Sequence, residues 1–211
     1  MSWKVFPIAV LIMGLVCAVM GATIHVPADQ PTIKDAYTVA AAGDTIQVAA
    51  GTYNDAYIDF TKAITIMGAN AGIHGTDARG PESVWRSGGS TVRLKCDDVT
   101  IDGFRIEPTS NRWMDNNHDA NGFRFVNNIV DCSSAGSNVF QTEGAVSYRD
   151  WVLQANYFMI GDKTMLHLGG GGSAADFTNL LIKNNKIEGT QGGFIFWTAG
   201  VPSNFRFHDN E

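Results

Sequence analysis

A short segment near the middle of the chain contains its densest group of chemically useful side chains: Arg112, Trp113, Asp115, His118 and Asp119. Carboxylates such as Asp115 and Asp119 supply the oxygen ligands that Ca²⁺ prefers. His118 or Arg112 suits the role of a base, and an exposed Trp113 would stack on a sugar ring. A cation that neutralises a carboxylate and a base that removes a proton are the requirements of β-elimination on a uronate. The segment therefore predicts catalytic residues Arg112 and His118 beside a metal site.

This segment lies in an insertion between two repeats of the chain, which begin at Ile101 and Phe125. Long loops on a rigid scaffold commonly carry binding and catalytic residues. A second interpretation stays open, because the same residue types form turns in solvated surface loops. The acidic residues also do not complete a known calcium-binding loop.

Two further groups are candidates for substrate binding. Lys183 and His208 occupy the same place in successive repeats, and Arg206 lies close by, which predicts a small cationic patch for a uronate or sulfate group. Mixed polar rows are also the ordinary surface of a repeat protein, so this patch has a purely structural interpretation too. Trp197 would present its ring to a sugar if the neighbouring phenylalanines fill the core, or it would be covered by a loop.

Two titratable residues have weaker signals. His167 lies between apolar residues on a predicted strand and would face away from the side that they bury. Glu143 shows no partner in the sequence, and we interpret it as a solvated turn residue.

A repeat sets the elements that position these residues. An apolar residue, two mostly polar residues, usually an Asn, a spacer and a second apolar residue recur from Ile101, Phe125, Leu153, Ile182 and Phe207. A period of 24 to 29 residues in short β-like segments indicates a parallel β-solenoid. Successive coils lie about 4.8 Å apart, so the leading apolar residues form an inner column. The asparagines at 128, 156, 185 and 210 form a hydrogen-bonded ladder at a corner that needs left-handed backbone.

The pattern of residues 31–42 predicts one amphipathic helix. Thr32 is the expected N-cap, and Asp35 follows it three residues later. A solenoid must cover the open end of its stack, so this helix is expected to cap the N-terminal end. From residue 44 to residue 211 the pattern predicts coils of short strands.

Several segments resemble the opening of the pectin-lyase-like superfamily. They are VPADQPTIKDA at 26–36, AGDTIQV at 42–48, ITIMGAN at 64–70 and DVTIDGF at 98–104. The resemblance implies an all-β, right-handed parallel β-helix with a capping helix, and a protein that binds or cuts acidic or neutral polysaccharides. The catalytic motifs of polygalacturonases, pectin methylesterases, pectate lyases and alginate epimerases do not occur in this sequence. The resemblance therefore concerns the scaffold and supplies no catalytic residue.

The first 22 residues predict an export signal, because Lys4 precedes an apolar stretch that ends in Met20-Gly21-Ala22. Cleavage would leave one domain, residues 23–211, secreted or held in the cell envelope. Two alternatives stay open: a lipoprotein modified at Cys17, and a retained membrane anchor.

The formal net charge of the chain is −6, which argues against a nucleic-acid partner. Cys96 and Cys132 are too few for a disulfide scaffold and are interpreted as separate thiols. The last repeat stops at Glu211, within a coil. We therefore expect a fragment of a longer protein that self-associates through its open C-terminal end.

Together these features predict a secreted β-helix that binds or degrades extracellular polysaccharide, as a lyase or hydrolase of uronate-containing glycans with Ca²⁺ as the expected cofactor. The alternative is a non-catalytic surface or adhesive module.

Overall fold

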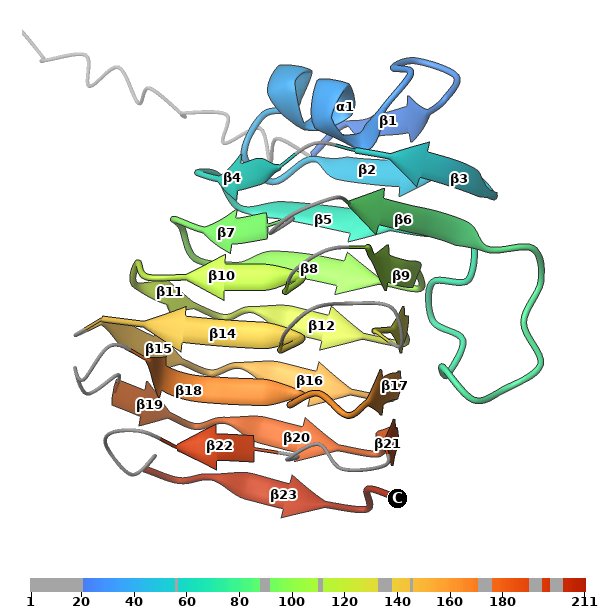
Figure 1. The fold of residues 1–211 in the computed structure, drawn as a ribbon. Helices are drawn as coiled ribbons and strands as arrows, with labels where there is room; N and C mark the ends of the chain where they lie inside the picture. The colour runs from blue at the N-terminus through green and yellow to red at the C-terminus, as the bar shows by residue number, and fades with distance from the viewer. Residues whose placement is uncertain are drawn as a thin grey trace, which may run out of the picture.

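The chain forms a parallel β-helix, a stack of coils whose strands align in long parallel sheets (Figure 1). This computed structural model describes residues 21–55, 57–87, 92–109, 112–132, 138–144, 146–170, 176–189, 195–197 and 203–211. Of residues 168–170 and 195–197 it describes the backbone alone. The predicted export signal, including Lys4 and Cys17, lies almost wholly outside these ranges. The predicted all-β solenoid is confirmed.

Four sheets run along the stack in the described part of the chain. Sheet A contains β1 (Thr23–Val26), β2 (Thr45–Val48), β5 (Ile64–Met67), β8 (Val99–Asp102), β12 (Arg124–Val126), β16 (Val152–Gln154), β20 (Leu181–Lys183) and β23 (Arg206–His208). Sheet B contains β3 (Gly51–Asn54), β6 (Ser83–Ser87), β9 (Arg105–Pro108), β13 (Ile129–Asp131), β17 (Tyr157–Gly161) and β21 (Lys186–Gly189). Sheet C contains β4 (Ile58–Phe60), β7 (Val92–Leu94), β10 (Met114–Asn116), β14 (Phe140–Glu143), β18 (Leu166–Gly170) and β22 (Ile195–Trp197). Sheet D contains β11 (Ala120–Asn121), β15 (Ser147–Arg149) and β19 (Asp176–Thr178).

The predicted asparagine ladder lies at the corner between sheets A and B. The side-chain Oδ1 of Asn156 accepts a hydrogen bond from the backbone N–H of Asn128 at 2.9 Å, and Asn185 and Asn210 repeat this contact one and two coils further on. Asn128, Asn156 and Asn185 are buried. The ladder therefore satisfies backbone donors that the turn removes from the sheets.

One detail of the ladder prediction is wrong. The left-handed residues of this corner are the ones immediately before the ladder asparagines, namely Asn127, Ala155, Asn184 and Asp209, with φ between 52° and 59°. The left-handed residue turns the chain, and the next residue can then point its amide inward. Backbone turning and coil-to-coil bonding are thus carried by two different positions.

The single described helix, α1 (Ile33–Val39), covers the N-terminal end of the stack (Figure 1). Thr32 is the N-cap as predicted, and its hydroxyl oxygen accepts from the N–H of Asp35 at 3.0 Å. The carboxylate of Asp55, at the end of β3, accepts from the N–H groups of Ile33 and Lys34 at 3.1 Å each. Since the helix ends at Val39, it is shorter than the predicted span of 31–42.

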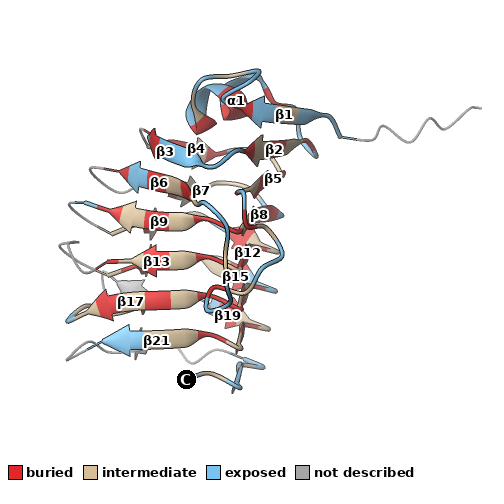
Figure 2. Ribbon diagram, turned by 90° about the vertical axis from the view of Figure 1, so that its right-hand side faces the viewer, coloured by how far each residue is buried: buried red, intermediate tan, exposed pale blue. Residues whose placement is uncertain are grey.

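The core is a set of apolar columns inside the coils (Figure 2). Ile101, Phe125, Leu153 and Ile182 follow one another in register and are fully buried, which confirms the predicted inner column. Phe207 continues the register but is 44% exposed, so its predicted burial is wrong. Its strand, β23, is the last of sheet A, and no described strand covers it.

Residues 69–82, here called the strap, run along the corner between sheets A and B and appear as the green loop beside the coils in Figure 1. The strap lies against the stack of coils. Its hydrogen bonds to the corner are Asn70 N to Gly103 O (3.3 Å), Gly72 N to Asp102 Oδ1 (3.1 Å), Arg79 Nη1 to Asn127 O (2.5 Å), Gly75 N to Ala155 O (2.8 Å) and the pair His74 Nε2 and Asn184 O (2.8 Å). The strap therefore ties distant coils together.

The contact at Gly75 requires glycine. A Cβ atom at this position would lie 2.6 Å from the N of Tyr157 and 2.8 Å from the O of Asn128. Backbone atoms of the coil cannot move aside as a flexible side chain can, so any larger residue would push the strap away.

Candidate functional site

Polar side chains form a continuous row on the outer face of sheet C. Asp59 pairs in register with Arg93, and Asp115 pairs with Gln141, which pairs with His167. The strand residues before them are buried in the core: Ile58, Val92, Met114, Phe140 and Leu166. Because side chains alternate along a strand, the row faces outward. We call Asp59, Arg93, Asp115, Gln141 and His167 the polar row.

The N-terminal end of the row combines an ion pair with a stacked cation. Lys95 Nζ lies 2.5 Å from Asp59 Oδ2. The guanidinium carbon of Arg93 lies 5.5 Å from the centroid of the Tyr57 ring, and its Nε donates to the backbone O of Asp115 at 3.3 Å. Burial, followed by the nearby Asp59 carboxylate, raises the pKa of Tyr57 to about 12, so the phenol is neutral. At this end of the row, Lys95 and Arg93 are therefore held by their contacts, and Tyr57 carries no charge.

Burial alone would raise the pKa of Asp59. Its contacts with Lys95 and Tyr57 and the charge of Arg93 outweigh that effect and hold the pKa below its ordinary value. Asp59 is therefore an anion at neutral pH.

Near the centre of this face, two carboxylates contact the same guanidinium nitrogen. Arg112 Nη1 lies 3.4 Å from Asp115 Oδ1 and 3.4 Å from Glu143 Oε1. These two carboxylate oxygens are therefore no more than about 7 Å apart, an upper limit that includes the separation of the carboxyl groups in retaining glycosidases. Glu143 Oε1 also accepts from Gln141 Nε2 at 2.5 Å.

Amide side chains extend this contact network to the imidazole of His167. Asn138 Nδ2 lies 3.1 Å from His167 Nδ1 and donates to Gln141 Oε1 at 3.1 Å. Burial, and then the positive charge of Arg112, lower the pKa of His167, although Glu143 opposes the shift. The imidazole is therefore neutral near pH 7, with Nδ1 as the acceptor for the Asn138 amide.

One shielded polar atom on this face, Arg112 Nε, has no hydrogen-bond partner within the part of the chain that the structure describes. The Tyr57 hydroxyl and Asp59 Oδ1 are shielded too, but these two groups interact with each other. Nearly all buried polar groups in proteins find a partner, so Arg112 Nε is expected to bind water or a ligand. The face is thus supplied with unused hydrogen-bonding capacity.

The structure does not contain the predicted loop around Trp113. Residues 114–116 and 120–121 form β10 and β11, so this segment belongs to a coil. Trp113 is fully buried, and its ring lies 5.0 Å from that of Phe125 and 5.7 Å from that of Phe140. Its predicted stacking on a sugar is wrong, because the residue before β10 points into the core.

Arg112 and Asp115 do lie together, whereas His118 lies at the following corner and Asp119 contacts sheet D. His118 occupies the corner between β10 and β11, where its backbone O accepts from Asn116 at 2.8 Å. Asp119 Oδ1 accepts from the N–H of Ser147 at 2.7 Å on the side of sheet D. No group of three His, Cys, Asp or Glu side chains arranged for a metal ion occurs among the described residues. Calcium at Asp115 and Asp119 stays a prediction.

The predicted cationic residues lie on sheet A, away from the polar row. Lys183 and His208 are register neighbours as expected, and Arg206 pairs with Leu181. His208 Nδ1 lies 2.7 Å from Asp209 Oδ2, so a carboxylate offsets part of this charge. Trp197 pairs in register with Leu168, and its side chain lies outside the described part of the structure.

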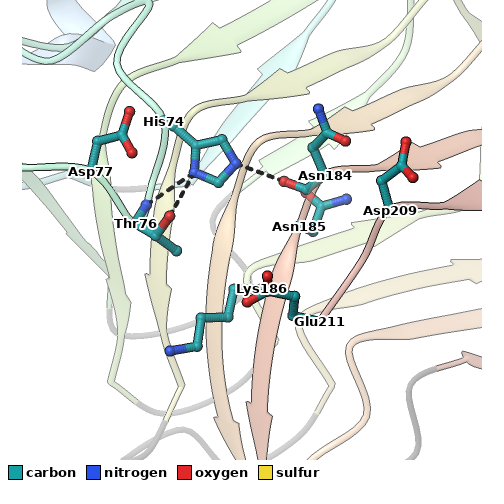
Figure 3. A pocket seen from close by; sticks show the side chains of 8 residues that line it. All are labelled: His74, Thr76, Asp77, Asn184, Asn185, Lys186, Asp209 and Glu211. Carbon is teal, nitrogen blue, oxygen red and sulfur yellow. Dashed lines mark hydrogen bonds between the residues drawn. The ribbon is translucent and has the colours of Figure 1, made fainter.

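A pocket of about 300 Å³ lies between the strap and the last coils (Figure 3). His74 crosses its edge, with Nδ1 accepting from Thr76 N at 3.2 Å and Nε2 against Asn184 O. Asp77, Lys186, Asp209 and Glu211 complete much of the lining. The pocket belongs to the corner between sheets A and B, so it is separate from the polar row.

Sequence reasoning missed Glu143 and Gln141 as members of a site and left His167 without a role. A signal was present for His167, which lies between Leu166 and Leu168, and for Gln141, which directly follows Phe140. The strands of sheet C share no recurring sequence pattern, however, and the sequence did not show which polar residues become neighbours.

Protein-family models, curated proteins and solved structures were all compared with the chain. None matches it. No helix among the described residues has the length and apolar character needed to cross a membrane. The polar row therefore has to be interpreted from its own chemistry.

Proposed function

We propose that the protein binds an extended polysaccharide along the outer face of sheet C. The observation that carries this proposal is the polar row, in which neighbouring strands present Asp, Arg, Asp, Gln and His side chains in register. Adjacent strands lie about 4.8 Å apart, so the row offers polar contacts at regular intervals. A chain of repeating sugar units presents hydroxyl groups at regular intervals too. The shielded Nε of Arg112 adds an unused donor.

A comparison with sheet B supports the choice of face. Sheet B also carries charged side chains, but they form short ion pairs: Arg86 with Glu107 at 2.7 Å, Arg105 with Asp131 at 2.7 Å, and Lys186 with Glu188 at 2.7 Å. The contacts of Arg112 on sheet C are longer, at 3.4 Å. The charged groups of sheet B already satisfy one another, whereas the long contacts of Arg112 on sheet C leave room for a ligand to improve them, although Lys95 and Asp59 on the same sheet form a short pair.

The predicted export signal in residues 1–22 would bring the protein to the place where such polymers occur. The resemblance to pectin-lyase-like proteins points to the same class of ligand. Both are expectations from the sequence and are consistent with the proposal.

The test is a binding measurement on a panel of soluble polysaccharides by affinity electrophoresis and titration calorimetry. Replacing Arg93 and His167 together by Ala removes two side chains of the polar row, and we expect at least a tenfold loss of affinity. The matched control replaces Arg124 and His208 by Ala, which removes the same residue types from the outer face of sheet A. We expect the control to lose less than twofold.

An equal loss in both variants would reject the polar row as the binding face, and a larger loss in the control would favour the cationic residues of sheet A. If the wild-type protein binds no polysaccharide of the panel, the proposal fails and a structural or adhesive module becomes the better interpretation.

Cleavage of the bound chain is a second candidate function, favoured by the pair of carboxylates around Arg112. One carboxyl group would protonate the leaving oxygen while the other acts as base or nucleophile. Glu143→Gln and Asp115→Asn should then each abolish the release of reducing ends. Unsaturated products instead would indicate β-elimination, with neutral His167 as the base. Intact polymer after long incubation would leave binding alone.

A further inference from the structure

We infer that the polar row selects neutral polysaccharides over polyanionic ones, an inference that rests on the proposed function. Among the described residues, the outer face of sheet C carries three carboxylates, Asp59, Asp115 and Glu143, and three cations, Arg93, Lys95 and Arg112. Their formal charges cancel. A face built for a polyanion needs an excess of positive charge, and the described side chains of this face provide none.

The cations of the face are already engaged. Lys95 pairs with Asp59 at 2.5 Å, and Arg112 lies between Asp115 and Glu143. A carboxylate on the ligand would have to displace a protein carboxylate from either cation. That exchange gains little, because one charge-assisted hydrogen bond replaces another.

Arg93 is the exception, since no described carboxylate forms an ion pair with it. It stacks on Tyr57 and is anchored through Nε to the backbone of Asp115. One ligand carboxylate could bind there. A polyuronate, however, carries a carboxylate on every unit, so the following units would face Asp115 and Glu143 on the next two strands. Repulsion at these positions cancels the gain at Arg93.

The remaining polar side chains of this face suit the binding of sugar hydroxyl groups. Asn138 and Gln141 are amides, His167 is held neutral by burial and by Arg112, and Tyr57 is a neutral phenol. Neutral donors and acceptors bind sugar hydroxyls without a charge on the ligand. The net charge of −6 over the whole chain acts in the same direction and repels a polyanion at long range.

The experiment compares polymers that share a backbone and differ in charge through their substituents, in the presence of a chelator so that no cation bridges them to the protein. One pair is highly methyl-esterified homogalacturonan and the same polymer after de-esterification. The other pair is hydroxyethyl cellulose and carboxymethyl cellulose. In whichever pair binds, we expect the neutral polymer to bind at least tenfold more tightly than the acidic one at low salt. This gap in affinity should narrow at higher salt, because salt screens the repulsion.

Two variants separate the local charges from the net charge. Asp115→Asn together with Glu143→Gln removes both carboxylates around Arg112 and should narrow the gap between the acidic and neutral polymers. The control, Glu188→Gln together with Asp209→Asn, changes the net charge equally at exposed positions outside sheet C. We expect the control to leave most of the gap in place.

Equal or tighter binding of the acidic polymers by the wild-type protein would overturn this inference while leaving the proposed function intact. An equal effect of the two double variants would also overturn it, because selection would then reside in the net charge. Absence of binding to every polymer, in contrast, would remove the proposed function itself.

Discussion

The strap offers a sharp test of how the coils are held together, through the substitution Arg79→Met. The side chain of Arg79 is 4% exposed, and its Nε and Nη2 contact both carboxylate oxygens of Glu82 at 2.9 and 3.0 Å. Its Nη1 donates to Asn127 O at 2.5 Å, on a coil far from Arg79 in the sequence. Methionine has a similar length but makes none of these bonds. The substitution therefore leaves a largely buried carboxylate and a carbonyl without their donors.

Breaking a buried ion pair by removing one partner costs roughly 3 to 5 kcal/mol. Glu82 keeps some solvent contact and its hydrogen bond from Asn70 Nδ2 at 3.0 Å, so we expect the low end, about 3 kcal/mol. The assay is equilibrium unfolding in urea, followed by circular dichroism and by tryptophan fluorescence. Arg79→Met combined with Glu82→Leu should recover at least about 1 kcal/mol, because no charge is then left unpaired.

The matched control is Arg86→Met, the same substitution at a pair with Glu107 on sheet B. The side chain of Arg86 is 47% exposed, so the expected cost is within about 1 kcal/mol. If Arg79→Met destabilises no more than Arg86→Met, or if the double variant is as unstable as Arg79→Met alone, the strap is not a buried clamp and this reasoning is refuted.

Three further predictions follow from named contacts. Asn156→Ala should cost at least about 2 kcal/mol in urea unfolding, because a buried N–H and a buried carbonyl lose their partners, while Asn117→Ala, at an exposed position, should cost almost nothing. Burial, and then the charge of the preceding aspartate, raise the pKa of the Cys132 thiol to about 12, so a thiol reagent at pH 8 should label it only as fast as the protein unfolds, and rapid labelling would contradict its burial. If Asp115 and Asp119 bind Ca²⁺, calorimetry should show a site that is lost in the double Ala variant, and absence of heat in the wild-type protein would reject it.

Much of the fold follows from local sequence patterns, which can be recognised without knowing how the loops are arranged. Thr32 and Asp35 specify the start of the helix through a hydrogen bond between residues only three positions apart. The sequence alone therefore predicts where the helix begins. The inner column of Ile101, Phe125 and Leu153 follows from a repeated apolar position. From Ile101 onward the strands of sheet A also share one recurring sequence pattern, usually followed by an Asn, and the register of these strands could therefore be read directly.

Sheet C was decided by tertiary structure. The coil segments leading to its strands vary in length, and a shift of one residue moves a side chain from the outside to the inside. Trp113 therefore fell on the core side, although its neighbours Arg112 and Asp115 lie on the outer face. The contact between Arg112 and Glu143 joins residues on different coils, and nothing local to either one encodes it.

The sequence thus determined that the chain stacks into parallel coils with an asparagine ladder and a capped N-terminal end, because each of those features repeats or is completed within a few residues. Only the tertiary structure decided which polar residues meet on sheet C and where the strap lies. Both depend on the register between successive coils. That register is set by how complete coils pack on one another rather than by any short segment.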